Sequence, residues 1–319
     1  MKLKQNFTKS LFALARLMPG RKKLPILIYH RVLDEHDPFR SMEPDVDEFA
    51  MQMKVIRDNF ETMQISSAAR KLKSNALPKN ALCITFDDGY RDNLLNAGKI
   101  LQSNNLTATF FIATGYMNHG VMWNDKILDA FKYTEKTALN LTRFEQGEYI
   151  FHTIDERIKT ARKIIKSIKY HEMEKREEIV AEILRQLAVK IDNQYMMTAE
   201  ELIKLRDIGV EIGGHTRSHP ILANLSDAAA LQEITEGKAA LEAILQTKIT
   251  SFAYPNGRFM DDYSKRTVDL VKQAGFECAV TTNYGISDTA SEEFELNRIS
   301  CWQKNETALS LYLSKIYFK

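Results

Sequence analysis

Cysteine is scarce in this sequence, and the scarcity excludes a small protein held together by disulfides. The chain of 319 residues contains three cysteines, Cys83, Cys278 and Cys301. An odd and sparse set does not form a disulfide framework, and the spacing is not that of a zinc site. Cys83 and Cys278 lie in short apolar runs, so we expect them to pack in the core. The low count favours a reducing compartment.

Long apolar runs and an excess of one charge are also missing. No stretch approaches the ~20 apolar residues that a transmembrane helix needs, and no repeat or low-complexity segment is present. Lys and Arg number 44 against 42 Asp and Glu. This near balance argues against a general nucleic-acid-binding protein. With 44% hydrophobic and 27% charged residues, the composition is that of an ordinary globular protein.

Acidic residues are absent from residues 1–23, which carry seven Lys and Arg. The apolar residues of this segment recur at spacings of three and four, on one face of a helix. Such a helix can lie on an anionic membrane surface, or it can be a solvated helix that caps the fold. A signal peptide is not indicated, because Arg16 interrupts the apolar stretch. We expect a cytoplasmic protein that can associate peripherally with the inner face of the membrane.

Short apolar runs alternate with longer amphipathic stretches, which predicts repeated β-α units and a parallel sheet. The predicted strands are Ile26–Tyr29, Thr62–Ile65, Leu82–Phe86, Ala108–Ala113, Val210–Gly213, Ser251–Tyr254, Cys278–Thr281 and Leu296–Ile299. The predicted helices are Asp47–Asn59, Arg91–Asn104, Ala199–Asp207, Ala228–Leu245 and Ser264–Ala274. Residues 115–197 differ, with helical patterns at Glu156–Ile168 and His171–Val189. We interpret them as a helical insertion whose charges form a solvated surface.

Four polar clusters each follow a predicted strand. They are Tyr29-His30-Arg31, Asp87-Asp88-Gly89, the segment 215–219 (HTRSH) and the segment 254–257 (YPNG). Turns need polar residues, so one such cluster means little. In parallel α/β barrels, however, catalytic residues collect at the carboxyl ends of the strands. Parallel strands would therefore bring the four clusters to one rim.

The segment 215–219 and the two aspartates contain candidate ligands for a metal ion. His215 and His219 are four residues apart, so one helical turn brings them to the same side. A carboxylate added to this pair gives three ligands and leaves positions for water and substrate, as in catalytic zinc sites. Of two adjacent carboxylates, one can bind the metal while the other takes a proton. Cobalt, nickel or iron would also suit such ligands.

Together these residues resemble a known family, the polysaccharide deacetylases of carbohydrate esterase family 4 (the NodB-homology domain). The segment 85–89 (TFDDG) resembles the first family motif, 215–219 matches the second, His-Ser/Thr-x-x-His, and 252–257 (FAYPNG) resembles the third. The motifs occur in family order across residues 24–114 and 198–300. The resemblance implies a distorted (β/α)₇ barrel, and the helical insertion at about 115–197 lies outside the matching segments. We therefore expect a deacetylase domain at 24–319 after the basic segment 1–23.

The resemblance also implies residue roles. Asp88, His215 and His219 would bind a divalent metal, with zinc expected, and Asp87 would be the general base. A backbone N–H in the third motif, here at Tyr254 beside Pro255, would stabilise the oxyanion. The substrate would be an N-acetylated amino-sugar glycan, such as an exopolysaccharide, a cell-envelope glycan or a precursor.

The chain departs from the family pattern in its acid residue. Many members carry the general acid as a His in a C-terminal Leu-x-His motif, whereas this chain has Leu296-Asn297-Arg298 and no His after His219. His30, after the first strand, resembles the acid of a permuted subgroup that includes poly-N-acetylglucosamine deacetylases. The alternative is that His30 is an ordinary loop residue.

A second departure concerns the residue that orients the base. The family often has an Arg two places before the Pro of the third motif, and Ala253 occupies that place. Arg298 and Arg258 are the candidates to supply the missing guanidinium, and we predict that Arg298 pairs with Asp87. Two other functions stay open, an O-deacetylase and a catalytically silent glycan-binding protein. Retention of Asp87 and all three candidate ligands speaks against the silent protein.

Overall fold

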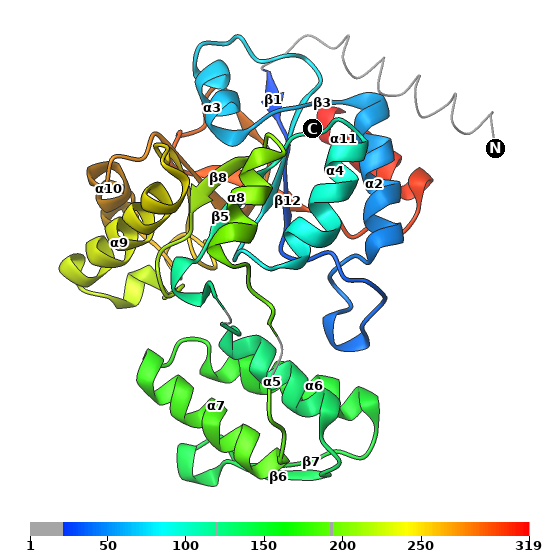
Figure 1. The fold of residues 1–319 in the computed structure, drawn as a ribbon, viewed down its shortest axis with the longest axis vertical. Helices are drawn as coiled ribbons and strands as arrows, with labels where there is room; N and C mark the ends of the chain where they lie inside the picture. Colours follow the sequence, from blue (N-terminus) through cyan, green and yellow to red (C-terminus); the bar gives the residue numbers. More distant parts are fainter. Residues whose placement is uncertain (1–21, 119, 192–193, 319) are drawn as a thin grey trace. The chain divides into compact units, whose positions relative to one another are not determined.

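The structure is a computed structural model that describes residues 22–118, 120–191 and 194–318. It divides into two compact units, shown in Figure 1. The first unit contains the chain up to His36, then Met42–Met117, and the chain from Met197 onward. The second contains Asp37–Ser41 and Asn118–Met196. Of the basic segment 1–23, all but Lys22 and Lys23 lies outside the described residues.

Seven parallel strands form a closed barrel in the first unit, which confirms the predicted fold. Their order is β2-β12-β10-β9-β8-β5-β4, and β4 pairs with β2 to close the ring. The strands are β2 (Ile26–Tyr29), β4 (Ala81–Phe86), β5 (Thr109–Ile112), β8 (Glu211–Gly214), β9 (Ser251–Ala253), β10 (Cys278–Tyr284) and β12 (Leu296–Ser300). Outside the ring, β3 (Glu61–Thr62) pairs with β4, and β1 (Lys23–Leu24) pairs antiparallel with β11 (Ser287–Asp288).

Alternate residues along each strand face the barrel interior, because successive side chains of a strand point to opposite faces. The amino-terminal part of the interior is apolar and contains Ile26, Cys83, Phe111, Ala253, Cys278, Val280 and Leu296. Helix α3 (Ile65–Lys73) closes this end by packing Ile65, Ala68 and Leu72 against the same cluster. Cys83 and Cys278 are buried free thiols here, as their apolar surroundings in the sequence predict.

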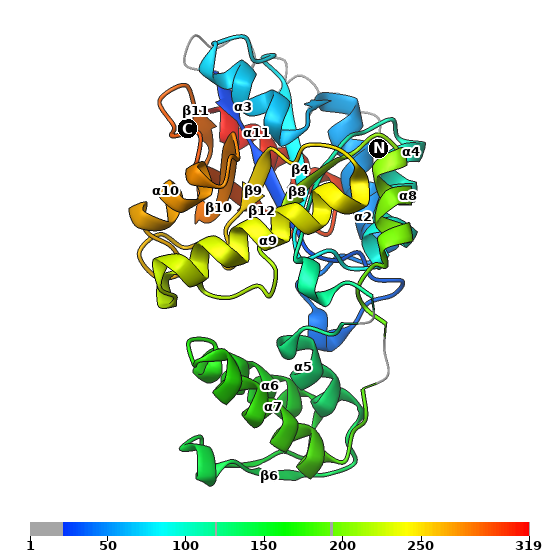
Figure 2. The same ribbon diagram turned by 60° about the vertical axis from the view of Figure 1, so that its left-hand side comes forward.

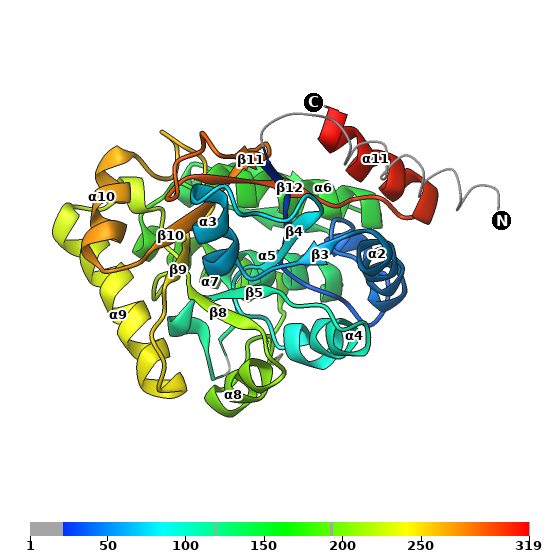
Figure 3. The same ribbon diagram turned by 90° about the horizontal axis from the view of Figure 1, so that it is seen from above.

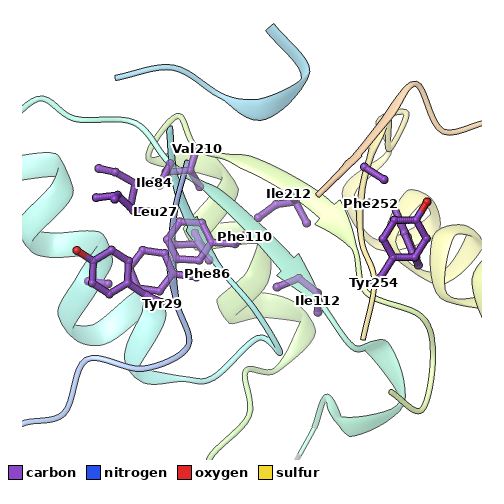
Figure 4. Close-up of a cluster of buried hydrophobic side chains, with 14 of the residues drawn as sticks. Leu27, Tyr29, Ile84, Phe86, Phe110, Ile112, Val210, Ile212, Phe252 and Tyr254 are labelled. Atoms are coloured by element: carbon purple, nitrogen blue, oxygen red, sulfur yellow. The ribbon is translucent and has the colours of Figure 1, made fainter. Parts of the chain in front are cut away.

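The intervening residues face outward and form a second apolar layer under the helices (Figure 4). Tyr29, Phe86 and Phe110 stack in a row across three neighbouring strands, with ring centroids 5.4 Å and 4.6 Å apart. Aromatic pairs of this geometry add to the free energy gained from burial. The row fixes the carboxyl ends of β2 and β4 relative to one another, and the polar site residues follow directly.

Helices surround the barrel, as Figure 3 shows for α2, α4, α8, α9 and α10. Their bounds are α2 Val46–Asn59, α4 Lys99–Ser103, α8 Ala199–Asp207, α9 Asp227–Leu245, α10 Lys265–Gln273 and α11 Glu306–Phe318. Short turns of 3₁₀-helix cover Thr114–Tyr116 (η3) and Leu222–Asn224 (η5). In Figure 2, α9 lies beside β8, the strand that leads into the second motif. No helix within the described ranges is both long and apolar enough to cross a membrane.

Two predicted elements differ from the structure. The predicted strand Thr62–Ile65 is wrong in its second half, because α3 begins at Ile65. Thr109 Oγ1 accepts the Ile65 N–H at 3.0 Å, and the Glu211 carboxylate accepts the Ser66 N–H at 3.2 Å. The predicted helix Arg91–Asn104 begins instead as a π-helical turn, η2 (Asn93–Gly98), before α4. Such turns are frequent at functional sites.

The second unit is built around three helices, α5 (Trp123–Tyr133), α6 (Ile154–Ile168) and α7 (Met173–Leu187). A hairpin of β6 (Ala138–Asn140) and β7 (Glu148–Ile150), with a 3₁₀ turn η4 (Thr142–Phe144), completes this part of the chain. The helices share their own apolar cluster, which includes Trp123, Phe131, Phe151, Ile164 and Ile183. The insertion predicted at about 115–197 overlaps this unit.

A buried ion cluster ties the segment Asp37–Ser41, which contains the short helix η1 (Pro38–Arg40), into this unit. Arg40 Nη2 lies 2.7 Å from Asp125 Oδ1 and 2.9 Å from Asp129 Oδ1. All three side chains are almost fully buried, and Tyr195 donates to Asp129 at 2.7 Å. The interpretation of the insertion's charges as a solvated surface is therefore wrong for Asp125 and Asp129.

Candidate metal centre and active site

The first motif turns sharply at the carboxyl end of β4. Asp87 N–H still donates to Tyr29 O at 3.0 Å and so continues the pairing with β2. The chain then takes positive φ angles at Asp88 (77°) and Gly89 (92°). A Cβ at Gly89 would lie 3.1 Å from Ile112 Cγ2, so both the backbone angle and the space require glycine. The turn places the two carboxylates side by side at the rim.

Asp88, His215 and His219 bring one ligand atom each to a common point. These atoms lie within 4.8 Å of one another. Asp88 Oδ1 is 3.5 Å from His215 Nε2 and 3.4 Å from His219 Nε2, and this buried oxygen accepts no hydrogen bond from the described residues. His215 Nδ1 lies 2.7 Å from Ala253 O. A proton on Nδ1 makes that bond and leaves the Nε2 lone pair facing Asp88.

The protonation states of this cluster suit a divalent cation. Burial lowers the pKa of His219 to about 4, so its imidazole is neutral near pH 7. Burial by itself raises the pKa of Asp88, but the neighbouring histidines outweigh it and hold the pKa below its usual value. Metal ions bind neutral imidazole and ionised carboxylate. With two nitrogens, one oxygen and an orphaned buried acceptor, the residues fit such an ion.

The loop between the two histidines adopts an unfavourable backbone that a neighbouring helix supports. Thr216 and His219 have positive φ angles of 63° and 54°. Glu233 on α9 accepts hydrogen bonds from Arg217 N (3.1 Å), Ser218 N (2.8 Å) and Ser218 Oγ (2.6 Å). Left-handed angles cost about 1–3 kcal/mol at a non-glycine residue. Glu233 offsets this cost and fixes the spacing of the two imidazoles.

We expect Glu233→Ala to weaken zinc binding by about 10–100-fold, the usual effect of losing a group that orients ligands. The measurement is a competition titration of zinc against a chelator. Glu236→Ala is the matched control, because Glu236 lies on the same helix but bonds to side chains, Arg217 Nη1 at 2.9 Å and Gln232 Nε2 at 2.7 Å, and not to the loop backbone. Equal zinc affinity in the two variants would contradict the assigned role of Glu233.

Arg298 lies inside the barrel and pairs with Asp87 through two parallel hydrogen bonds. Its Nη1 lies 2.8 Å from Asp87 Oδ1 and its Nη2 lies 2.7 Å from Oδ2. The guanidinium also donates to Thr281 O at 2.7 Å and to Thr85 Oγ1 at 3.1 Å. Both partners are almost fully buried. Burial by itself raises the pKa of Asp87, but Arg298 outweighs it and lowers that pKa. Arg258, the other candidate, is exposed.

His30 follows β2, and two side chains hold its backbone. Asn93, in the π-helical turn, donates from Nδ2 to His30 O at 2.8 Å. Glu43 accepts the N–H of Arg31, the next residue, at 3.2 Å. Burial by itself lowers the pKa of His30, but the carboxylates of Asp88, Glu43 and Asp87 raise it above its ordinary value. His30 therefore retains a proton more readily than His219 does.

The third motif places its backbone differently from the prediction. Tyr254 N–H donates to Val280 O at 3.3 Å within the barrel, and the Tyr254 ring faces outward and stacks on Tyr263 at 4.2 Å. Pro255 follows, buried, and then Asn256 with a positive φ of 60°. Among the described residues, no acceptor faces the Asn256 N–H. The free N–H of this turn is thus at Asn256 and not at Tyr254.

Glu43, Glu233 and Asn93 are site residues that the sequence motifs do not indicate. Glu233 follows His219 by a whole loop and the start of α9, and Glu43 lies in the loop between β2 and α2. Only the acidic character of these positions is visible in the sequence. Glu43 and Glu233 accept remote backbone N–H groups and Asn93 donates to a remote backbone carbonyl, so their contacts leave no local pattern in the sequence.

These features define the class of protein, an α/β barrel with a candidate divalent-metal centre and an Asp87–Arg298 ion pair at the carboxyl ends of its strands. Residues 74–279, more than half of the chain, match the profile of the family described as polysaccharide deacetylase. The chain belongs to this family. The relationship supports a hydrolase that removes acetyl groups from a glycan.

Individual proteins resemble the chain over most of its length. YxkH of Bacillus subtilis, which is named as a polysaccharide deacetylase, is 22% identical over 279 residues, covering 87% of this chain and 71% of YxkH. The deacetylase PplD of Streptococcus pyogenes, solved with acetate, superposes with a TM-score of 0.62 at 20% identity, covering 92% and 98% of the two chains. IcaB of Ammonifex degensii gives 0.60 at 18% identity, covering 91% and 97%. At such identities the two structures establish a shared fold.

Proposed function

We propose that this protein is a metal-dependent N-deacetylase of an amino-sugar glycan. The observation that carries the proposal is the convergence of Asp88, His215 and His219 on one point. Asp87, whose pKa is lowered, precedes Asp88 on the same turn, and the carboxylates of Asp88, Glu43 and Asp87 raise the pKa of His30. PplD, a deacetylase of the same fold, was solved with acetate, the product that this reaction releases.

Asp88, His215 and His219 would hold the cation, and zinc suits their two nitrogens and one oxygen. When bound, the ion would supply Lewis-acid chemistry, which polarises the acetyl carbonyl and lowers the pKa of a water molecule. Asp87, ionised and aimed by Arg298, accepts the proton of that water. Backbone N–H groups of the 254–257 turn are the candidates to stabilise the oxyanion, with the Asn256 N–H free for this purpose.

His30 distinguishes an amide substrate from an ester. An amine expelled as an anion is a very poor leaving group, so the nitrogen must receive a proton as the C–N bond breaks. His30 has the raised pKa that this role needs, because the negative charges of Asp88, Glu43 and Asp87 favour its protonated form. An O-deacetylase has less need of such a donor, because alkoxides leave more readily. The presence of His30 as a general acid therefore favours N-acetyl groups over O-acetyl groups as the substrate.

We expect His30→Ala to bind metal normally but to lose about 10²–10⁴-fold in turnover of N-acetylglucosamine oligomers, the contribution of general acid catalysis. Turnover of p-nitrophenyl acetate should fall much less, because its leaving group needs no proton. Both rates are measured on the same preparation. An equal fall for the two substrates would mean that His30 does something other than protonate the amine.

We also propose that residues 1–23 bring the protein to the cytoplasmic face of a membrane and precede a deacetylase domain at 24–319. The support is their composition, seven basic residues and no acid. Sedimentation with vesicles containing phosphatidylserine should pull down the full chain but not a variant lacking residues 1–23, and high salt should release it, since salt screens such charges. Equal sedimentation of the two would contradict this proposal.

A further inference from the structure

Trp302, two residues after the end of β12, is an exposed aromatic side chain. The chain contains two tryptophans. Trp123 is 8% exposed and belongs to the apolar cluster of the second unit, whereas Trp302 is 49% exposed. Tryptophan is among the residues most enriched where proteins contact their ligands and partners. The position of Trp302 in the fold indicates which ligand it can contact.

The pairing of β12 with β2, continued past the ends of both strands, leads to Trp302 and His30. The strands are parallel, with Ile299 opposite Leu27 and Ser300 opposite Ile28. Two further residues along the same register bring Trp302 level with His30. Gln52 holds the chain in this course, because its Nε2 donates to Cys301 O (3.5 Å) and Gln303 O (3.2 Å), the carbonyls on either side of Trp302.

The alternation of side chains places the indole on the side of the site. Leu296 belongs to the interior cluster, and Arg298 reaches Asp87 inside the barrel. Ile299 and Cys301 belong to the outer layer under the helices. The alternation persists to Cys301, and continued by one residue it directs Trp302 to the side of Arg298 and Asp87.

We propose that the Trp302 indole stacks on a sugar ring of the glycan substrate, next to His30. The inference rests on the proposed function and adds a binding position to it. The ring of N-acetylglucosamine carries its substituents equatorially, so both faces present C–H groups that suit an aromatic face. A ring stacked there lies beside the group that protonates the leaving nitrogen. An exposed indole needs no rearrangement to receive it.

The test compares Trp302→Ala and Trp302→Phe with the wild type on N-acetylglucosamine oligomers. The alanine variant should raise KM about ten-fold, the loss expected for one aromatic contact, with kcat little changed. The phenylalanine variant should retain most of the affinity. Turnover of p-nitrophenyl acetate should be unchanged. Tyr284→Ala is the control, because Tyr284 is also exposed but lies against Tyr312 of α11.

Fluorescence separates this inference from the proposed reaction. Oligomer addition should change the emission of the wild type and of Trp123→Phe, but not that of Trp302→Phe. If this pattern holds without acetate release, the binding position stands and the proposed reaction fails. If acetate is released but Trp302→Ala has the wild-type KM, the inference fails and the reaction stands. An absence of any emission change on saturation with oligomer would also overturn the inference.

Discussion

Asp87→Asn should lower acetate release by about 10²–10⁴-fold while the protein still binds metal. Asparagine has nearly the same shape and keeps an oxygen for Arg298, but it cannot accept a proton from the attacking water. General base catalysis contributes a factor of this size. The measurement pairs the rate of acetate release with the metal content of the same sample.

The control for this variant must allow for stability, because Arg298 is left buried without a counter-charge. Breaking a buried ion pair costs about 3–5 kcal/mol of the free energy of unfolding. Rates are therefore compared at a temperature where circular dichroism shows both proteins folded. Asp269→Asn makes the same chemical change at an exposed side chain of α10 and should have no effect. Turnover of Asp87→Asn at the wild-type rate would exclude Asp87 as the base.

His215→Ala should lose stoichiometric metal, and with it all measurable turnover. The substitution removes one of three ligands and also the ring that bonds to Ala253 O at 2.7 Å. Two remaining protein ligands do not make the three-ligand site of a catalytic zinc. Metal content after dialysis, measured by atomic emission, gives the direct readout. His36→Ala, at an exposed position, is the matched control.

If His215→Ala retained as much metal as His36→Ala, the assigned ligand set would be wrong. A partial loss that added zinc restores would still support it, because mass action can refill a weakened site. The diagnostic quantity is thus the zinc dissociation constant, measured for both variants against the same chelator.

The barrel strands were predictable because each is a short apolar run whose alternate residues face two different apolar layers. Thr85 and Phe86 are an example, because both side chains are buried, Thr85 toward the barrel interior and Phe86 under the helices. The start of α3 was not predictable, because its first N–H groups bond to Thr109 and Glu211, far along the chain. The same holds for the segment Asp37–Ser41, which Arg40 ties to Asp125 and Asp129.

The site was predictable where family motifs recur, and less so where this chain departs from them. Ala253 in place of an arginine indicates that a guanidinium must come from elsewhere, and the structure places Arg298 of β12 against Asp87. The oxyanion donor could not be chosen from the motif, since only the structure shows the Tyr254 N–H bonded to Val280 O. Glu43 and Glu233 could not be predicted, because they accept hydrogen bonds from backbone N–H groups, which are present at almost every residue.

Acetate release from N-acetylglucosamine oligomers, before and after removal of metal, tests the central claim most directly. We expect the purified protein to release acetate and to lose this activity after exhaustive dialysis against a chelator. One equivalent of zinc should restore it to the wild type but not to His215→Ala. Acetate release at an undiminished rate by metal-free protein would contradict the account.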